Sequence, residues 1–209
     1  MTLARSLWQE NSTTAAAALA HPFIRDIADG SLPNRTFSAY VAQDAFFLDA
    51  YARAYGLAMS RSAERETLLA FAGLIAGVRD ELVLHDDYAQ EWGVDVNNVA
   101  PTETTMVYTN FLLATAATGS VGLICAAMTP CMRLYAHLGQ ELARIGAEPD
   151  NPYLDWIRTY SGTEFELLAQ SLERLLDKHC TGEPVERAIY RQAMNLELRF
   201  FDSATSELS

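Results

Sequence analysis

Basic residues and cysteines are both scarce in this sequence. Lys and Arg number 15 against 27 Asp and Glu, which gives a formal net charge of −12. Nucleic-acid binding requires a basic face, so this balance argues against a nucleic-acid partner. The three cysteines are an odd number without CxxC spacing, which argues against a disulfide framework and against a zinc site. A cytoplasmic location is the simplest expectation.

Long apolar runs, strand-like alternation and glycine-rich loops are missing as well. No stretch of about 18 apolar residues is free of charges or helix breakers, so we expect no membrane span and no membrane partner. Alternating β-branched runs and internal repeats are absent, and no glycine-rich phosphate loop is present. These absences leave an all-α protein. Half of the 209 residues are hydrophobic, which suffices for the full core of one domain over residues 1–209.

Helical periodicity and the placement of Pro and Gly predict a single-domain helical bundle with antiparallel neighbours and short loops. Asn34 is expected to cap the helix that follows it. The expected helices are residues 3–20, 23–27, 35–61, 64–92, 101–117, 121–145, 153–160, 164–179 and 185–206.

Three residues interrupt the apolar stripes of these helices. Asp44 takes a core position in the helix after Asn34, and Glu197 takes one in the last helix. Cys131 lies on the stripe of residues 121–145, directly after Pro130, and a proline inside a helix removes a backbone hydrogen bond. Burying a carboxylate is costly unless a partner offsets it. The chain thus offers two core-face carboxylates and one core-face thiol on three helices.

This combination suits covalent addition chemistry. A carboxylate in an apolar pocket has a raised pKa and can carry a proton near pH 7, and a thiol becomes a nucleophile when a neighbour takes its proton. Each residue alone has a plainer interpretation, because a core cysteine is most often a small apolar residue and a core carboxylate most often a structural partner. Their coincidence favours a site. The tyrosines that could line it are Tyr51, Tyr55, Tyr108 and Tyr160.

A series of motifs runs along nearly the whole chain in a fixed order. They are His21-Pro22-Phe23, Asp29-Gly30-Ser31-Leu32-Pro33, Phe37-x-x-Tyr40-Val41-x-Gln43-Asp44-x-x-Phe47-Leu48, Pro101-Thr102, Tyr108-Thr109, Pro130-Cys131-x-x-Leu134-Tyr135, Thr159-Tyr160-x-Gly162 and Glu197. Together they resemble the TenA family (thiaminase II, aminopyrimidine aminohydrolase). The resemblance implies a heme-oxygenase-like bundle that uses no haem or other cofactor and assembles as a homotetramer.

The resemblance also implies roles for individual residues. Cys131 would add to the pyrimidine ring of a small-molecule substrate, and Glu197 would transfer protons. Asp44 would bind the amino and ring-nitrogen edge, which suits a carboxylate acceptor opposite N–H donors. Tyr108 and Tyr160 would fix and stack the ring.

The implied reaction belongs to thiamin salvage. It hydrolyses 4-amino-5-aminomethyl-2-methylpyrimidine to hydroxymethylpyrimidine and ammonia, with thiaminase II activity at the same carbon as a lesser reaction. Phe47 stands where better-known bacterial members carry tyrosine, so we expect it to form a pocket wall with Tyr51 and to lack the hydroxyl function. Cys131 places the chain in the cysteine subgroup of the family.

Two alternatives stay open. Helical bundles can hold two metal ions, and the candidate ligands here are Asp44, Glu81, His85 and Glu197. Glu81 and His85 are four residues apart rather than three, and they lie in an acidic segment typical of a solvated helix face. The other alternative is a non-catalytic protein that binds a pyrimidine or thiamin, or that regulates transcription, although the net charge argues against direct DNA contact.

Overall fold

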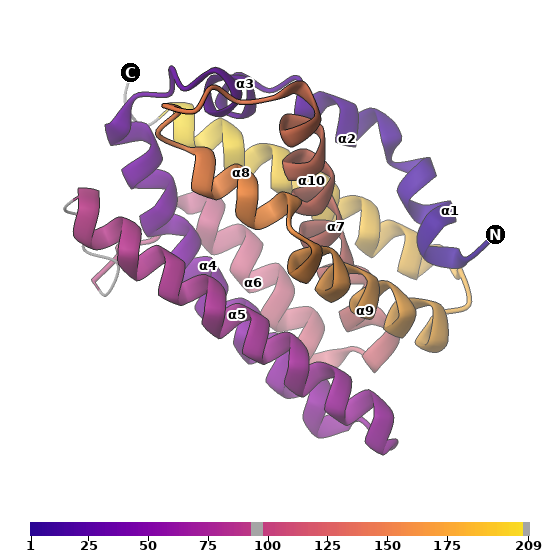
Figure 1. The fold of residues 1–209 in the computed structure, drawn as a ribbon. Coiled ribbons are helices and arrows are strands. Elements are labelled where there is room, and N and C mark those ends of the chain that lie inside the picture. Colours follow the sequence, from indigo (N-terminus) through magenta and orange to yellow (C-terminus); the bar gives the residue numbers. More distant parts are fainter. Residues whose placement is uncertain (93–97, 207–209) are drawn as a thin grey trace.

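Ten α-helices make up most of residues 1–92 and 98–206, the part of the chain that this computed structural model describes. For residues 84–92 and 206 only the helical backbone is described. No strand occurs within the described ranges, and the all-α prediction is confirmed. The helices are α1 Leu3–Glu10, α2 Ser12–Leu19, α3 Pro22–Asp29, α4 Asn34–Arg61, α5 Arg65–Trp92, α6 Glu103–Thr118, α7 Val121–Ile145, α8 Leu154–Ser161, α9 Thr163–His179 and α10 Pro184–Ser206 (Figure 1).

Two local predictions are wrong. The single helix expected over residues 3–20 is divided, because α1 ends at Glu10 and α2 begins at Ser12. Between them, the Asn11 side chain donates to the Leu7 carbonyl at 2.8 Å, and an asparagine side chain that binds local backbone competes with helix continuation. Asn34 does not cap α4: it is the first helical residue, and Pro33 holds the cap position without a side-chain hydrogen bond.

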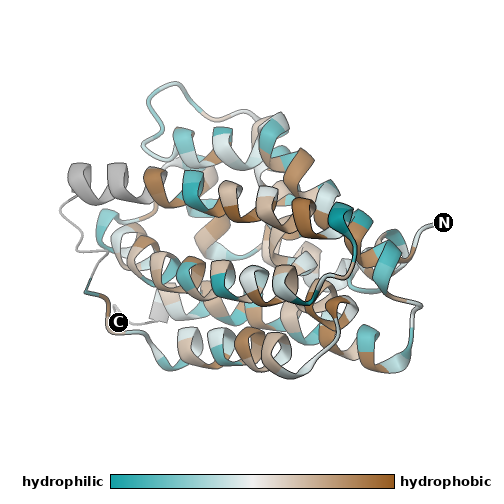
Figure 2. Cartoon of the chain, turned by 90° about the horizontal axis from the view of Figure 1, so that it is seen from below, coloured by the Kyte–Doolittle hydropathy of each residue, from teal (hydrophilic) through white to brown (hydrophobic). Residues whose placement is uncertain are grey.

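The helix α7 lies at the centre of the arrangement. It packs against α8, α9 and α10 and also contacts α4 and α6, while α4 and α5 form a long pair on one side (Figure 1). Apolar and polar residues alternate around the helices, as expected where each helix buries one face (Figure 2). By length and composition α7 could cross a membrane, but 72% of its most apolar window is buried inside the protein, which is typical of a core helix.

The apolar stripes predicted from the sequence form the core. Tyr40, Phe47 and Tyr51 of α4 are all buried. Met128 and Leu134 of α7 and Met194 and Phe201 of α10 are buried as well. One glycine sets the distance between two of the helices. A Cβ atom on Gly139 of α7 would lie 2.4 Å from the carbonyl carbon of Tyr160, so only glycine lets α8 approach α7 this closely. This contact places Tyr160 beside the centre of the bundle.

Candidate active site

One buried carboxylate joins three helices at the centre of the bundle. Glu197 of α10 is only 2% exposed and accepts a hydrogen bond from the hydroxyl of Tyr108, on α6. The thiol of Cys131, on α7, lies close enough to the same carboxylate for each group to shift the pKa of the other. The structure therefore brings together the thiol, the glutamate and one of the tyrosines that the sequence singled out. This arrangement allows a proton to pass between sulfur and carboxylate.

Both the acid and the thiol hold their protons unusually strongly. Burial, assisted by the negative charge of Asp44, raises the pKa of Glu197 to about 8, although the hydrogen bond from Tyr108 opposes the rise. Cys131 is half-buried, yet loss of water around its sulfur raises the pKa of the thiol well above its usual value. The charges of Glu197, Glu81 and Asp44 raise it further. A positively charged ligand would favour ionisation of both groups.

Asp44 lies against a cluster of tyrosines. The residue is 4% exposed. Burial, followed by the charge of Asp44, raises the pKa of Tyr40 well above its usual value, so this hydroxyl stays protonated and can donate. The Tyr40 hydroxyl donates to the Tyr135 hydroxyl at 3.2 Å and accepts from the Trp156 indole N–H at 3.4 Å. The charge of Asp44 is thus felt by a buried network of hydroxyl and indole groups.

Aromatic rings form one wall of the site. The centroid of Phe47 lies 4.8 Å from that of Tyr108 and 5.3 Å from that of Tyr51. The Tyr51 hydroxyl donates to the Met128 carbonyl at 2.6 Å, which ties α4 to α7 three residues before Cys131. Tyr51 therefore helps to fix α7 against α4. Phe47 is 3% exposed and packs against the rings of Tyr51 and Tyr108.

Tyr160 is contributed by α8. Its ring lies 4.9 Å from the ring of Tyr135 and 4.7 Å from that of Trp156, and the residue is 1% exposed. Its hydroxyl donates to the carboxylate of Glu81, on α5. The structure thus adds a third carboxylate and a further tyrosine, Tyr135, to the set expected from the sequence.

Tyr135 could be predicted from the sequence as a site residue, whereas Glu81 could not. Tyr135 lies four residues after Cys131, one helical turn away, so its place on the same face of α7 was predictable. The sequence offers Glu81 only as a candidate metal ligand, and the acidic residues around it indicate a solvated helix face. Among the described side chains, no group of three or more His, Cys, Asp or Glu could hold a metal ion. The side chain of His85 lies outside the described residues.

Fold and site together define a class of protein: an all-α bundle whose buried centre combines a thiol, carboxylates and tyrosines. The model of the TENA/THI-4/PQQC family matches residues 7–207, and the chain belongs to this family. The resemblance inferred from the sequence is confirmed.

Several relatives have names that describe an activity. The aminopyrimidine aminohydrolase of Halalkalibacterium halodurans is 33% identical over 217 residues, covering 99% of this chain and 97% of that protein. The bifunctional TH2 protein, mitochondrial, of Arabidopsis thaliana is 36% identical, and the match covers 93% of this chain. This chain spans only 36% of the length of the TH2 protein.

Solved structures extend the likeness of the fold. A TenA family transcription regulator from a Silicibacter species superposes with a TM-score of 0.89 at 24% identity, covering 98% of this chain and 97% of the other. Heme oxygenase-1 of the cyanobacterium Synechocystis, in complex with heme, gives a TM-score of 0.65 at 13% identity, covering 100% and 94%. These two likenesses concern the fold alone, and they confirm the heme-oxygenase-like architecture.

The histidines whose side chains are described do not lie at the centre of this bundle. A proximal histidine is a common axial ligand, but the described histidines lie elsewhere, His21 near Asp202, His137 against Trp8, and His179 beside Thr67.

Proposed function

We propose that the protein is an aminopyrimidine aminohydrolase of thiamin salvage, which hydrolyses 4-amino-5-aminomethyl-2-methylpyrimidine to hydroxymethylpyrimidine and ammonia. The observation that carries this proposal is the buried carboxylate of Glu197, which accepts a hydrogen bond from Tyr108 and lies close enough to the Cys131 thiol for each group to shift the pKa of the other. Relatives named aminopyrimidine aminohydrolase support a hydrolase that acts on C–N bonds.

In the proposed reaction, Glu197 takes the thiol proton as the sulfur of Cys131 forms a bond to a ring carbon of the pyrimidine. Addition ends the aromaticity of the ring, and the displaced ring electrons break the exocyclic C–N bond. The amine, which binds as an ammonium group, leaves as neutral ammonia. Water then adds to the exocyclic carbon and passes its proton to the ammonia. The C–S bond breaks, Glu197 returns the thiol proton to sulfur, and the ring regains its aromaticity. A nucleophile is needed because direct displacement of an amine by water is difficult.

The surrounding side chains suit a flat, hydrogen-bonding ring. Asp44 would accept N–H bonds from the amino and ring-nitrogen edge. The rings of Phe47, Tyr51 and Tyr108 would enclose its faces, and Tyr160 would bound the opposite side. Because Phe47 has no hydroxyl, orientation of the substrate falls to the remaining tyrosines.

The decisive measurement is ammonia release from the aminomethylpyrimidine by the wild type and by Cys131→Ser. We expect turnover to fall on the order of 10³-fold or more, with the helical circular dichroism unchanged, because serine is a far weaker nucleophile. Cys180→Ser is the matched control, because Cys180 is buried and donates to the Gly122 carbonyl at 3.1 Å, a bond that serine can also make. This control should retain wild-type turnover.

Other outcomes would change the assignment. Wild-type turnover that survives Cys131→Ser would overturn the covalent mechanism. Cleavage of thiamin without ammonia release would make the protein a thiaminase II. Pyrimidine or thiamin binding without either reaction would favour a non-catalytic binder or regulator.

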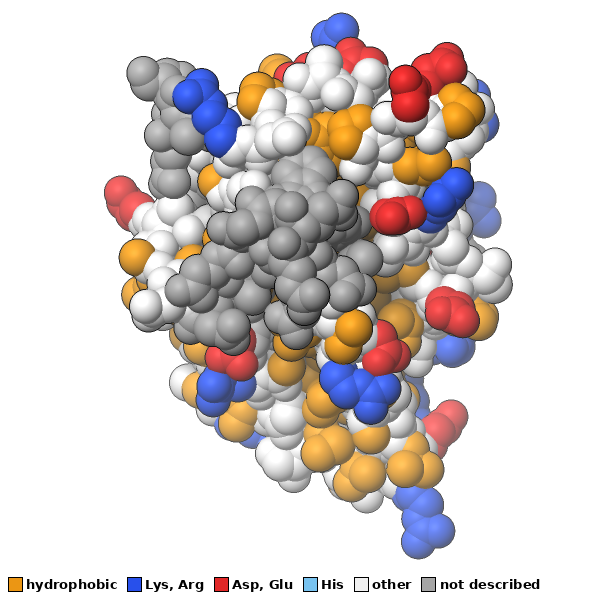
Figure 3. Space-filling view, turned by 60° about the vertical axis from the view of Figure 1, so that its left-hand side comes forward, with side chains coloured by type: hydrophobic (Ala, Val, Ile, Leu, Met, Phe, Trp, Pro, Cys, Tyr) orange, Lys and Arg blue, Asp and Glu red, His pale blue; other side chains and the backbone are white. Residues whose placement is uncertain are grey.

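We also propose that the enzyme acts as a cytoplasmic homotetramer, as the family resemblance implies. Apolar side chains are interspersed with charged ones on the face in Figure 3, and Leu69, Ile145 and Leu167 are all more than half exposed. Such side chains are available for burial between subunits. Analytical ultracentrifugation should then give four times the mass of the 23.1 kDa chain.

A further inference from the structure

Glu81 lies where the buried site meets a surface groove. The groove has a volume of about 790 Å³ and is lined by Gly73, Gly77 and Glu81 on α5 and by Gly162 and Phe165 at the junction of α8 and α9. Gly73 and Gly77 leave their positions on this face of α5 without side chains. A Cβ added on Gly73 would meet nothing within 4 Å, so the space beside it is open. A half-buried carboxylate therefore stands beside a space that is open to small molecules.

The inner side of Glu81 is tied to the catalytic centre. Its carboxylate accepts a hydrogen bond from Tyr160, whose ring packs edge to face against Tyr135 at 4.9 Å. Tyr135 in turn lies one turn after Cys131 on α7, and the charge of Glu81 is felt at the Cys131 sulfur. The carboxylate thus reaches both the groove and the site.

Three carboxylates, Asp44, Glu81 and Glu197, act on the Cys131 thiol, and the substrate of the proposed function carries positive charge. In the proposed function, Asp44 binds the ring edge and Glu197 serves Cys131. The exocyclic amine of the substrate is an ammonium group at neutral pH, and the corresponding group of thiamin is a thiazolium cation. Each cation is the leaving group of its reaction. Each requires an anionic partner when it is buried away from water.

We propose that Glu81 binds the cationic leaving group of the substrate and that Tyr160 orients its carboxylate for this contact. The inference rests on the proposed function and extends it, because it makes Glu81 the residue that selects substrates with a positively charged leaving group. The departing ammonia is then delivered toward the groove between α5 and α9.

The test compares two ligands that differ at one position. In Glu81→Gln, KM for the aminomethylpyrimidine should rise roughly 10-fold or more, because a charge-assisted contact becomes a neutral one. The dissociation constant of hydroxymethylpyrimidine, which has a neutral hydroxyl at the same position, should change less than about 3-fold. Asp80→Asn is the matched control, because it removes one negative charge at the residue directly before Glu81. Asp80 lines the groove and pairs with Arg79 at 2.7 Å. It should leave both values unchanged.

Tyr160→Phe separates orientation from charge. It keeps the ring but removes the hydrogen bond, so KM for the amine should rise less than in Glu81→Gln and in the same direction. Equal weakening of both ligands in Glu81→Gln would show a merely structural role and overturn the proposal, as would wild-type values for both. A wild type that releases no ammonia would instead refute the proposed function, which keeps the two failures distinct.

Discussion

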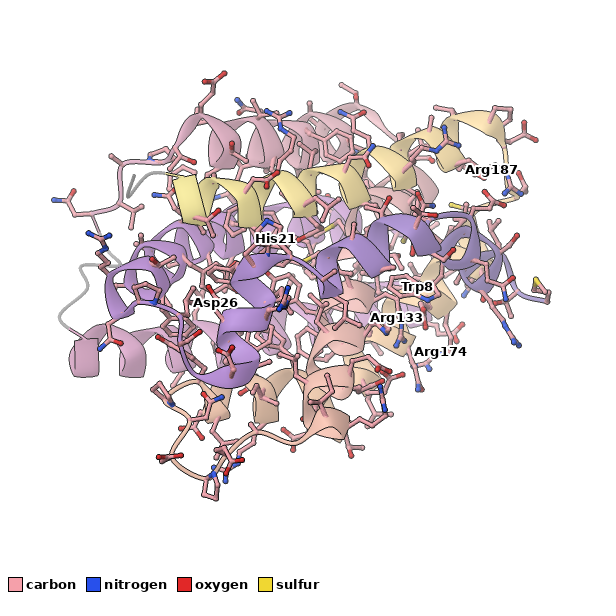
Figure 4. All side chains as sticks on the ribbon, turned by 90° about the horizontal axis from the view of Figure 1, so that it is seen from above. Trp8, His21, Asp26, Arg133, Arg174 and Arg187 are labelled. Atoms are coloured by element: carbon pink, nitrogen blue, oxygen red, sulfur yellow. The ribbon has the colours of Figure 1, made fainter. Side chains whose placement is uncertain are left out.

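Carboxylates on the two sides of α7 have pKa values that are shifted in opposite directions: the pKa of Glu197 is raised and that of Glu166 is lowered. Cys131 and Arg133 are two residues apart, which is roughly 200° around the helix. On the first side, Glu197 accepts a hydrogen bond from the Tyr108 hydroxyl, and the Cys131 thiol acts on its pKa. On the second side, Arg133 donates to Glu166 at 2.8 Å and to Glu173 at 2.7 Å, in a corner beside Trp8 and Arg174 (Figure 4).

The difference shows that the charge of the partner, and not burial alone, decides how a carboxylate titrates. Burial raises the pKa of Glu166, but hydrogen bonds from Arg133, Gln170 and Gln140 outweigh it and hold the pKa below its usual value. The two groups that lower the pKa of Glu197, Tyr108 and Cys131, are both neutral, and its pKa stays at about 8. One side of α7 therefore stabilises the fold, while the other keeps a reactive proton at the expense of stability.

The largest expected effect comes from Glu197→Gln, which removes the titratable carboxyl group on the Cys131 side of α7. Turnover should fall about 10²- to 10⁴-fold, because the variant cannot exchange a proton with Cys131. For the wild type, we expect kcat/KM to rise with pH toward a midpoint near 8, as Glu197 loses its proton. Ammonia release measured from pH 6 to 9 checks both, and an unchanged profile in the variant would contradict the role of Glu197.

The same substitution should alter the pH dependence of stability. The pKa of Glu197 is about 8 in the folded chain against an ordinary 4.5, so between these values the folded state holds a proton that the unfolded state releases. The contribution of this group is complete below pH 4.5 and is lost by pH 8. A loss on the order of a few kcal/mol is expected in the wild type. In Glu197→Gln this component should vanish, which urea unfolding at pH 5 and pH 8 would measure.

Arg133→Ala removes the cation that pairs with Glu166 and Glu173 on the other side of α7, and we expect a somewhat smaller effect. Removing the guanidinium leaves two partly buried carboxylates facing each other, which should cost about 3 kcal/mol of unfolding free energy. Arg53→Ala is the control, because Arg53 pairs with Asp49 at the surface and should cost less than about 1 kcal/mol. Thermal unfolding measures both. Comparable losses in the two variants would mean that the Arg133 cluster stabilises no more than a surface ion pair.

Much of this comparison was predictable from the sequence, and the unpredictable part has a physical cause. The periodicity places Asp44, Cys131 and Glu197 on core faces, because each helix must bury one face whatever its partners are. The periodicity does not say which helices meet. The pairing of Tyr160 with Glu81 depends on the close approach that Gly139 permits, and the sequence around Glu81 resembles a solvated face. Asn11 divides a helix through a local hydrogen bond that periodicity does not reveal.

The smallest expected effect comes from Tyr108→Phe, which sharpens the comparison by removing only one donor from Glu197. The ring that packs 4.8 Å from Phe47 is retained. The hydrogen bond from Tyr108 lowers the pKa of Glu197, so its loss should move the acidic limb of kcat/KM to higher pH and reduce turnover at pH 7 about 10-fold. Tyr190→Phe is the control: the Tyr190 hydroxyl is buried without a hydrogen-bond partner, and its removal should leave the profile unchanged. A Tyr108→Phe profile that matches the wild type would mean that burial and Asp44 alone set the proton affinity of Glu197.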